Sequence, residues 1–299
     1  MKFILGCCAV LLVVLLGGPT HAVEKLALYD DFNATLINPE KWVGYEVWSS
    51  WTSREIVRQI VWNRLRLFTR GYGDNTKETG RSPGGNRLRF TNSDAVTAIR
   101  ANIQVKSYEL TGSPGNPDYS FVRAALAGYF FNTGTPTPGS SENDVWAQVG
   151  IVRRSNSADP PDTLIVEAYS QHCSDKDCNA GTTLKYEPLG TIKVGERTTL
   201  SIKWDKINHR FLVKRDTASE VSLPYAVSDT SPPATSNLQR LDTSYSIANS
   251  TTQPRPTAMI DAYFDNVYVN QSAISATINL VEDHAILFDS AVTDESGGL

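Results

Sequence analysis

The stretch DVWAQVGIVR, residues Asp144–Arg153, carries Val, Ala, Val and Ile at every second position from residue 145, with Trp146, Gln148 and Gly150 between them. Successive side chains of a β-strand point to opposite faces, so this period of two predicts a strand with one apolar face and one aromatic and amide face. A sheet built from such strands buries one side, and its other side can hold a ligand.

Two further strand-like runs flank this one, at Arg123–Asn132 and Thr163–His172, and loops rich in Gly, Pro and Ser separate them. The third run has the same period of two. Its apolar residues oppose three polar or aromatic ones, Leu164, Val166 and Ala168 against Glu167, Tyr169 and Gln171.

The rest of the chain predicts more short strands and no helical period before residue 271. These strands are expected within Leu26–Phe32, Val57–Thr69, Ala98–Tyr108, Thr198–Arg215 and Ala258–Asn270. Gly71–Asn86 is dense in turn residues and predicts a loop, and Pro224–Pro256, broken by four prolines, predicts a largely irregular segment. The fold class predicted is all-β, an antiparallel β-sandwich or jelly roll in a single domain.

The N-terminus has the pattern of a signal peptide over residues 1–22: Met1-Lys2, an apolar run from Phe3 to Leu16, and a small residue, Ala22, before the expected cut. The run is too short to span a membrane, which takes about 20 apolar residues. We therefore expect a secreted, extracellular or periplasmic, monomeric protein without an integral membrane span. Residues 23–270 form its domain, and residues 271–299 form a tail with no predicted structure.

Net charge limits the classes of binding partner that we expect, and the cysteine content predicts a disulfide. The full chain has 28 basic and 32 acidic residues, and the leader contributes one Lys and no acid, so the mature net charge is −5. An acidic chain argues against nucleic acid or anionic lipid as a partner. Cys173 and Cys178 are the cysteines left after cleavage, and a pair so close in an exported chain predicts a disulfide at a hairpin tip.

Two motifs near the ends of the domain together resemble the concanavalin A-like lectin/glucanase superfamily, which includes laminarinase-like and LamG-like domains. They are Tyr29-Asp30-Asp31-Phe32-Asn33 and Tyr263-Phe264-Asp265-Asn266-Val267-Tyr268-Val269. The resemblance implies two curved antiparallel sheets with a ligand groove on the concave side. It places the predicted carbohydrate-binding residues on the groove floor: Arg123, Trp146, Gln148, Glu167, Tyr169 and Gln171.

The same resemblance implies a structural calcium ion between the first and last strands. Asp30 and Asp265 match the ligand positions, with Asp31 as a substitute, and calcium takes several oxygen ligands. In the alternative interpretation these carboxylates cap strand ends by accepting hydrogen bonds from backbone amides.

The hydrolases of the superfamily carry three acids in an E-x-D-x-x-E or E-x-D-x-E motif, and this chain matches only the first two. Glu142 and Asp144 have the right spacing, but Trp146 or Ala147 stands where the third acid belongs. A retaining glycosidase needs two opposed carboxylates, and Glu167 on the next strand is the remaining candidate. The R-x-E/R and Q-x-H signatures of the alginate-lyase branch are also missing. If the protein is an enzyme, Glu142, Asp144 and Glu167 are the catalytic candidates.

The preferred hypothesis is therefore a secreted, non-catalytic protein that binds a polysaccharide or other glycan in the groove. Trp146 and Tyr169 suit it because aromatic faces stack on sugar rings, although half-buried packing is the other role of such residues. The alternatives are a glycoside hydrolase or lyase of the same fold, and a structural or adhesive cell-envelope protein. Exposure of Trp146, Gln148 and Tyr169 together on one face would favour binding, whereas their burial would remove the residue-level support for it.

Overall fold

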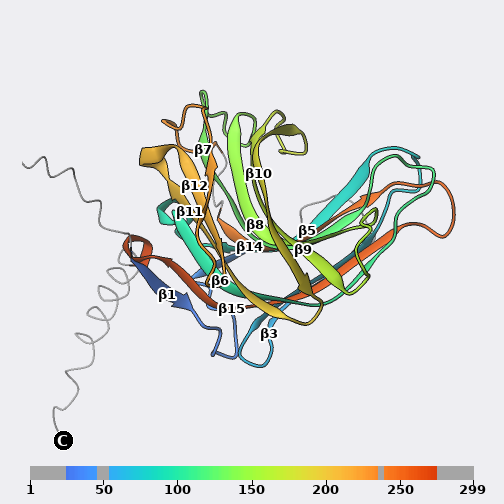
Figure 1. Ribbon diagram of the computed structural model, residues 1–299, viewed down its shortest axis with the longest axis horizontal. Coiled ribbons are helices and arrows are strands. Elements are labelled where there is room, and N and C mark those ends of the chain that lie inside the picture. Colours follow the sequence, from blue (N-terminus) through green and yellow to red (C-terminus); the bar gives the residue numbers. More distant parts are fainter. Residues whose placement is uncertain (1–24, 46–53, 235–238, 275–299) are drawn as a thin grey trace, which may run out of the picture.

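The computed structural model describes residues 25–45, 54–234 and 239–274, and within these ranges fifteen strands pair into two antiparallel sheets (Figure 1). The predicted signal peptide and residues 275–299 of the predicted tail lie outside the described residues. No helix in the described part of the chain is long and apolar enough to cross a membrane. The predicted fold class, an all-β antiparallel sandwich of the jelly-roll type, is confirmed.

The first sheet, which we call the pocket sheet, contains the three strands from which the sequence prediction started. Its strands run in the order β10 (Gly181–Lys193), β9 (Thr163–Cys173), β8 (Asp144–Arg154), β7 (Phe121–Asn132), β14 (Arg240–Ala248), β5 (Arg81–Phe90) and β2 (Trp42–Tyr45).

The second sheet, which we call the back sheet, carries both end motifs of the domain. Its order is β13 (Val221–Pro224), β12 (Arg210–Arg215), β11 (Arg197–Asp205), β6 (Ala98–Leu110), β15 (Thr257–Asn270), β4 (Leu65–Tyr72) and β3 (Arg54–Ile60), and β1 (Leu26–Asp30) also pairs with β15. Short 3-10 turns stand at Ser93–Ala95 and Lys206–Asn208.

The core lies between the sheets, and the period of two decides which residues enter it. On β8 the apolar set Val145, Ala147, Val149 and Ile151 is buried in the core, and β9 contributes its own alternate apolar residues. Burying one such aliphatic side chain contributes about 1.5–3 kcal/mol. A one-residue slip in register would send the whole set to the outer face, so the predicted register of β8 and β9 is confirmed.

The prediction of an irregular segment at Pro224–Pro256 is wrong for its central part. β14 (Arg240–Ala248) lies there, in the middle of the pocket sheet between β7 and β5. Its apolar residues Leu241, Tyr245 and Ile247 reach the core at every second position. The prolines flank this strand and do not interrupt it. They predicted turns, and the alternation of apolar and polar residues between them was overlooked.

The predicted loop at Gly71–Asn86 is wrong for the same kind of reason. β5 begins at Arg81, and Pro83, Gly84 and Gly85 form ladder pairs with β14. A glycine inside a strand often marks the close approach of a neighbour. Here a Cβ on Gly84 would collide with the ring of Tyr245, and a Cβ on Gly71 of β4 would collide with its hydroxyl. These glycines make room for a core tyrosine and are not turn residues.

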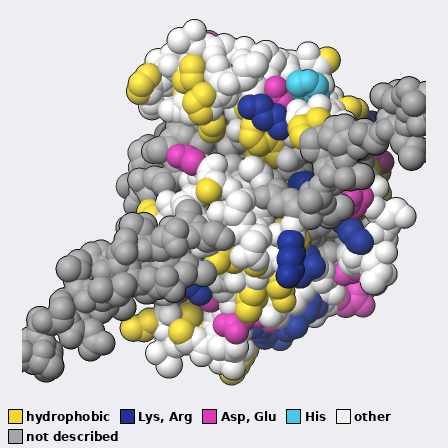
Figure 2. Space-filling model, turned by 90° about the vertical axis from the view of Figure 1, so that its left-hand side faces the viewer, with side chains coloured by type: hydrophobic (Ala, Val, Ile, Leu, Met, Phe, Trp, Pro, Cys, Tyr) yellow, Lys and Arg dark blue, Asp and Glu magenta, His cyan; other side chains and the backbone are white. Residues whose placement is uncertain are grey.

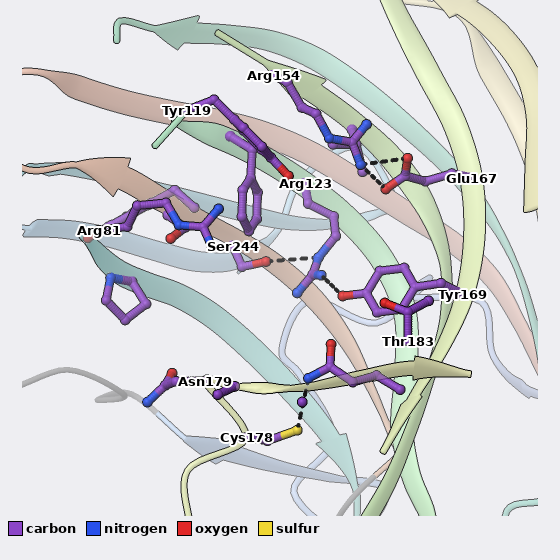
Figure 3. A pocket seen from close by; sticks show the side chains of 18 of the residues that line it. Arg81, Tyr119, Arg123, Arg154, Glu167, Tyr169, Cys178, Asn179, Thr183 and Ser244 are labelled. Atoms are coloured by element: carbon purple, nitrogen blue, oxygen red, sulfur yellow. Dashed lines mark hydrogen bonds and ion pairs between the residues drawn. The ribbon is translucent and has the colours of Figure 1, made fainter. Parts of the chain in front are cut away.

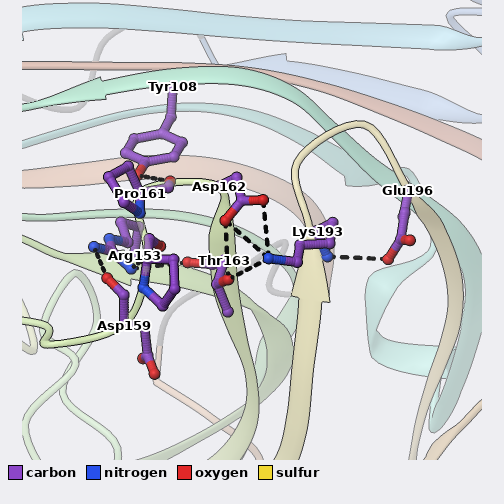
Figure 4. Close-up of polar contacts among 9 residues, drawn as sticks. Tyr108, Arg153, Asp159, Pro161, Asp162, Thr163, Lys193 and Glu196 are labelled. Carbon is purple, nitrogen blue, oxygen red and sulfur yellow. Dashed lines mark hydrogen bonds and ion pairs between the residues drawn. The ribbon is translucent and has the colours of Figure 1, made fainter.

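Hydrogen bonds pin the turn between β8 and β9 at the edge of the sandwich (Figure 4). Arg153 donates to the carbonyl oxygens of Asp159, Pro160 and Thr163. Lys193 on β10 donates to both carboxylate oxygens of Asp162, at 2.8 and 2.9 Å. The connection thus fixes the relative positions of the strands that enter the pocket.

Gly84→Ala tests the close approach of Tyr245 to β5. The added methyl group has no space beside the ring, and overpacking of this kind costs about 1–3 kcal/mol. We expect the free energy of unfolding, measured by urea denaturation, to fall by that amount. Gly134→Ala is the matched control, because its Cβ would meet only ordinary contacts at 3.8 Å. Equal effects of the two variants would contradict the explanation.

Candidate functional site

A pocket of about 720 Å³ opens on the outer face of the pocket sheet, the face turned away from the core (Figure 3). Strands β5, β7, β8, β9, β10 and β14 all contribute to its lining. Its charged and aromatic lining residues are Arg81, Tyr119, Phe121, Arg123, Arg154, Glu167, Tyr169, Tyr186 and Tyr245.

Arg123 holds the floor of the pocket together. Its guanidinium donates to Ser244 Oγ at 3.1 Å and to the Tyr169 hydroxyl at 3.0 Å, so it ties β7 to β14 and β9. Between β7 and β9 runs β8, where Gly150 pairs with Ala125 and Glu167 and has no side chain. A Cβ on Gly150 would lie 2.7 Å from the Ala125 Cβ. Because Gly150 has no side chain, no atoms beyond the backbone fill the centre of the pocket floor at this position.

Behind Arg123 lies a fully buried carboxylate, Asp242 of β14. Its Oδ2 is 3.4 Å from Arg123 Nη2, and its Oδ1 is 3.8 Å from Arg87 Nε. Burial, and after it the positive charge of Arg240, lowers the pKa of Arg87 to about 9. Several guanidinium groups therefore share one buried carboxylate.

Glu167 is the acid that lines the pocket, and both of its oxygens are engaged. Arg154 Nη2 donates to Oε1 at 2.6 Å and to Oε2 at 2.7 Å, and the Tyr186 hydroxyl donates to Oε2 at 3.0 Å. Burial raises the pKa of the Tyr186 phenol, and the charge of Glu167 adds to that effect. At neutral pH the phenol therefore remains a donor to the carboxylate.

The predicted carbohydrate-binding residues lie on one face, but only some of them line the pocket. Arg123, Glu167, Tyr169 and Gln171 are lining residues. Trp146 and Gln148 share the outer face and are buried: Trp146 is 5% exposed and Gln148 is not exposed at all. The exposure that would favour binding through Trp146, Gln148 and Tyr169 is therefore not observed. The three share one face, but two of them are buried.

Trp146 has partners that account for its burial. Its Nε1 donates to Gln148 Oε1 at 3.4 Å, Tyr129 packs edge-on at 4.8 Å, and Arg240 lies 4.4 Å above the ring. A tryptophan held between a tyrosine and an arginine has no free face for a sugar. The exposed aromatic surface at this site therefore comes from the tyrosines of the pocket.

Two of the catalytic candidates lie outside the pocket lining. Glu142 is exposed in the turn before β8. Asp144 is fully buried at the start of β8, where its Oδ1 accepts hydrogen bonds from Asn132 Nδ2 and from the amide of Ala234. The structure thus brings Glu167 into the pocket and leaves Glu142 and Asp144 at the loop end of the strand.

The predicted calcium ligands have other partners. Asp30 Oδ1 accepts from the Phe32 amide at 2.9 Å, and Asp30 Oδ2 accepts from Trp42 Nε1 at 2.6 Å. Asp265 Oδ2 is 3.6 Å from Arg197 Nη1. No group of three or more metal-ligating side chains occurs among the residues that the structure describes. This donor set favours the hydrogen-bonding role, and the calcium site stays a prediction.

The predicted disulfide is present. Cys173 and Cys178 are bonded, with their Cα atoms 4.9 Å apart, at the turn between β9 and β10. Cys178 and the residues that follow it, Asn179 to Gly181, line the pocket. The crosslinked turn is therefore part of the wall of the site.

Several pocket residues were missed at the sequence level. Ser244 and its buried neighbour Asp242 lie on the strand read as irregular, and Arg81 lies in the stretch read as a loop. Their signal was the alternation of Arg240, Asp242 and Ser244 with Leu241, Thr243 and Tyr245. Arg154 could have been found by continuing the even-numbered face of β8 beyond Gly150.

No protein-family model matches the chain, and no curated protein matches it. Similar solved structures include a glycoside hydrolase family 16 endo-glucanase from Bacteroides ovatus, at 11% identity over 80% of this chain and 97% of that one, with a TM-score of 0.42. A family 7 alginate lyase with bound product is 15% identical over 73% and 84%, with a TM-score of 0.39. A carbohydrate recognition domain is 12% identical over 82% and 98%, with a TM-score of 0.34.

These solved structures are 11–15% identical to this chain with TM-scores of 0.34–0.42, and they carry no argument about its family. They include enzymes that cut glycans and a domain named for recognising them. The fold of this chain rests on its own strand pairing, and its site on its own side chains.

Asp242→Asn tests the shared carboxylate. Removing its charge leaves buried guanidinium groups uncompensated, and loss of one partner of a buried ion pair costs about 3–5 kcal/mol. We expect the free energy of unfolding in urea to fall by about that much. The matched control is Asp162→Asn, which breaks the exposed ion pair with Lys193 and should cost far less. A loss no larger than that of the control would contradict the role of Asp242.

Proposed function

We propose that the chain is a secreted protein that binds a polysaccharide or other glycan in the outer-face pocket without cutting it. The observation that carries this proposal is the content of the pocket, where tyrosine rings, guanidinium groups and amides converge while the lining acid is held in an ion pair. The pocket volume of about 720 Å³ lies within the range of small-ligand sites, about 300–1,000 Å³.

The tyrosines supply the apolar surface that a sugar ring needs. Tyr186 is 43% exposed, and Tyr119 and Tyr169 are half-buried. The C–H faces of a pyranose stack on such rings, while nearby polar groups fix its hydroxyls. Gln171, Asn179 and Thr183 lie in the same lining and have the side-chain donors and acceptors for that task.

The state of the acids supports binding without cleavage. Glycoside hydrolysis by the usual route needs two carboxyl groups on either side of the scissile bond. In the pocket lining Glu167 is the carboxylate, and Arg154 and Tyr186 occupy both of its oxygens. Glu142 and Asp144 lie outside the pocket lining. Neither supplies the second carboxyl group of a catalytic pair with Glu167.

One observation favours an enzyme as the second candidate. Glu167, Tyr169 and Arg123 line one pocket, and a carboxylate or a phenol can transfer protons when its pKa suits the reaction. On this alternative Arg154 would have to release Glu167 when the substrate binds.

The test measures binding and cleavage on the same glycans. The secreted chain is applied to a glycan array that includes neutral and acidic polysaccharides, and the same polysaccharides are assayed for new reducing ends and for unsaturated products. We expect binding without product. Product release would favour the enzyme, and no binding to any glycan would overturn the proposed function in favour of a structural or adhesive role.

Tyr186→Ala tests stacking in the pocket. We expect an affinity loss of about tenfold, which corresponds to about 1.4 kcal/mol, because the variant removes an exposed ring. Tyr186→Phe keeps the ring and loses only the hydrogen bond to Glu167, so it should retain most of the affinity. Tyr72→Ala, at 44% exposure on the back sheet, is the matched control and should bind like the parent. Equal losses at positions 72 and 186 would place the ligand elsewhere.

A further inference from the structure

The outer face of the pocket sheet is far more basic than the chain as a whole. Its strands present six arginines: Arg81, Arg87, Arg89, Arg123, Arg154 and Arg240. The carboxylates at outer-face positions of the same described strands are Asp144, Glu167 and Asp242. The full chain, in contrast, has a net charge of −4. On the side of the molecule in Figure 2, acidic and basic side chains are interspersed.

We propose that the pocket selects an acidic glycan, one whose sugars carry carboxylate or sulfate groups, and that Arg81, Arg123 and Arg154 contact these groups. This inference rests on the proposed function and names the class of glycan. It follows from the number of arginines, from the way they are held, and from the arginines buried behind them.

The acids available on this face do not balance the arginines. Glu167 pairs with Arg154, and Asp242 is shared by Arg87 and Arg123. Arg81 forms no ion pair with any residue in the described ranges and contacts aromatic rings instead. Arg81 is exposed at the pocket, so an acidic group of a ligand can pair with its guanidinium and gain affinity from a charge-assisted contact.

Aromatic rings hold the pocket arginines in place before a ligand arrives. The Arg81 guanidinium lies 5.4 Å from the centre of the Tyr119 ring and 5.7 Å from that of Phe121. Arg154 lies 6.0 Å from the Tyr119 ring, and Arg123 lies 5.8 Å from the Phe121 ring. Each ring thus stands between two guanidinium groups. Cations fixed in this way lose little side-chain entropy on binding.

The choice of arginine also points to carboxylate or sulfate. The pocket lining contains arginine and no lysine among the described residues. A guanidinium presents a planar fork of donors that matches two oxygens of one acidic group, whereas an ammonium acts as a point charge. A neutral glucan offers hydroxyls, which need neither the fork nor the charge.

Buried arginines behind the pocket add positive charge to its surroundings. Gln148 Nε2 and Arg240 Nε are buried and have no hydrogen-bond partner among the described residues. Both atoms are donors, and the carboxylate oxygen Asp242 Oδ1 is a buried acceptor in the same condition. Arg240 and Arg87 are not lining residues. Their charges add to the positive potential that an anionic group meets at Arg123.

The test uses two pairs of polysaccharides, and the members of each pair share a sugar backbone and differ in their acidic groups. Polygalacturonate is compared with its methyl ester, and dextran sulfate is compared with dextran, by isothermal titration calorimetry at low and high ionic strength. We expect the charged member of at least one pair to bind at least tenfold more tightly than its neutral partner. We also expect that preference to shrink as salt screens the charges. The pair that responds identifies carboxylate or sulfate as the acidic group.

Arg81→Gln tests the pocket cation that has no ion pair to break, so the fold should be retained. We expect it to weaken binding of the acidic polysaccharide about tenfold and binding of the neutral one much less, because a neutral hydroxyl gains less from a guanidinium than a charged group does. Arg100→Gln on the back sheet is the matched control, because Arg100 also stacks on a tyrosine, 4.0 Å from the Tyr268 ring centre. Thermal unfolding of both variants checks their folding.

The outcomes separate this inference from the proposed function. Equal or tighter binding of the neutral polysaccharides would overturn the acidic-glycan inference and leave glycan binding intact. Binding of an oligonucleotide as tight as that of the acidic polysaccharide would also overturn it, because the site would then read phosphate charge and not a sugar. Absence of binding to every polysaccharide would overturn both.

Discussion

The ion pairs of Asp242 are the contacts on which the outer face depends. β14 lies between β5 and β7, so a carboxylate at this position reaches arginines from both neighbours, Arg87 and Arg123. Arg123 then extends to Tyr169 across β8 and sets the floor of the pocket. Without a negative charge at the centre, these guanidinium groups would repel one another in a poorly solvated space. One acid thus allows arginines from two neighbouring strands to be placed close together on a folded sheet.

The parts of the fold that could be predicted are those in which hydrophobic periodicity is uninterrupted. β8 and β9 alternate cleanly, so their register and the faces of Trp146 and Tyr169 followed from the sequence. β5 and β14 could not be recognised in the same way, because the glycines and prolines in or beside them occur both in turns and in strands. In a turn they relax the backbone, whereas Gly84 in a strand makes room for Tyr245, a residue about 160 positions away.

The candidate site was predicted in part for a related reason. A strand pattern shows which side chains share a face, but not which of them a neighbouring strand will cover. Trp146 and Gln148 share the predicted face and are covered, whereas Tyr186 on the edge strand is open. Net charge was also a poor guide to the site, because the sum over the chain conceals where the charges lie. Six arginines on one face are compatible with an acidic protein when most acids lie elsewhere.

The disulfide at the β9–β10 turn links the site to the place where the protein works. Cys173 ends a strand of the floor, and Cys178 begins the part of the turn that lines the pocket. In a compartment that keeps thiols reduced, this turn would lose its crosslink and the wall would be free to move away from Gln171 and Tyr169. A newly made chain would therefore carry an unfinished site. If the chain is exported as proposed, the crosslinked wall of the pocket would be completed only where the two thiols can be oxidised.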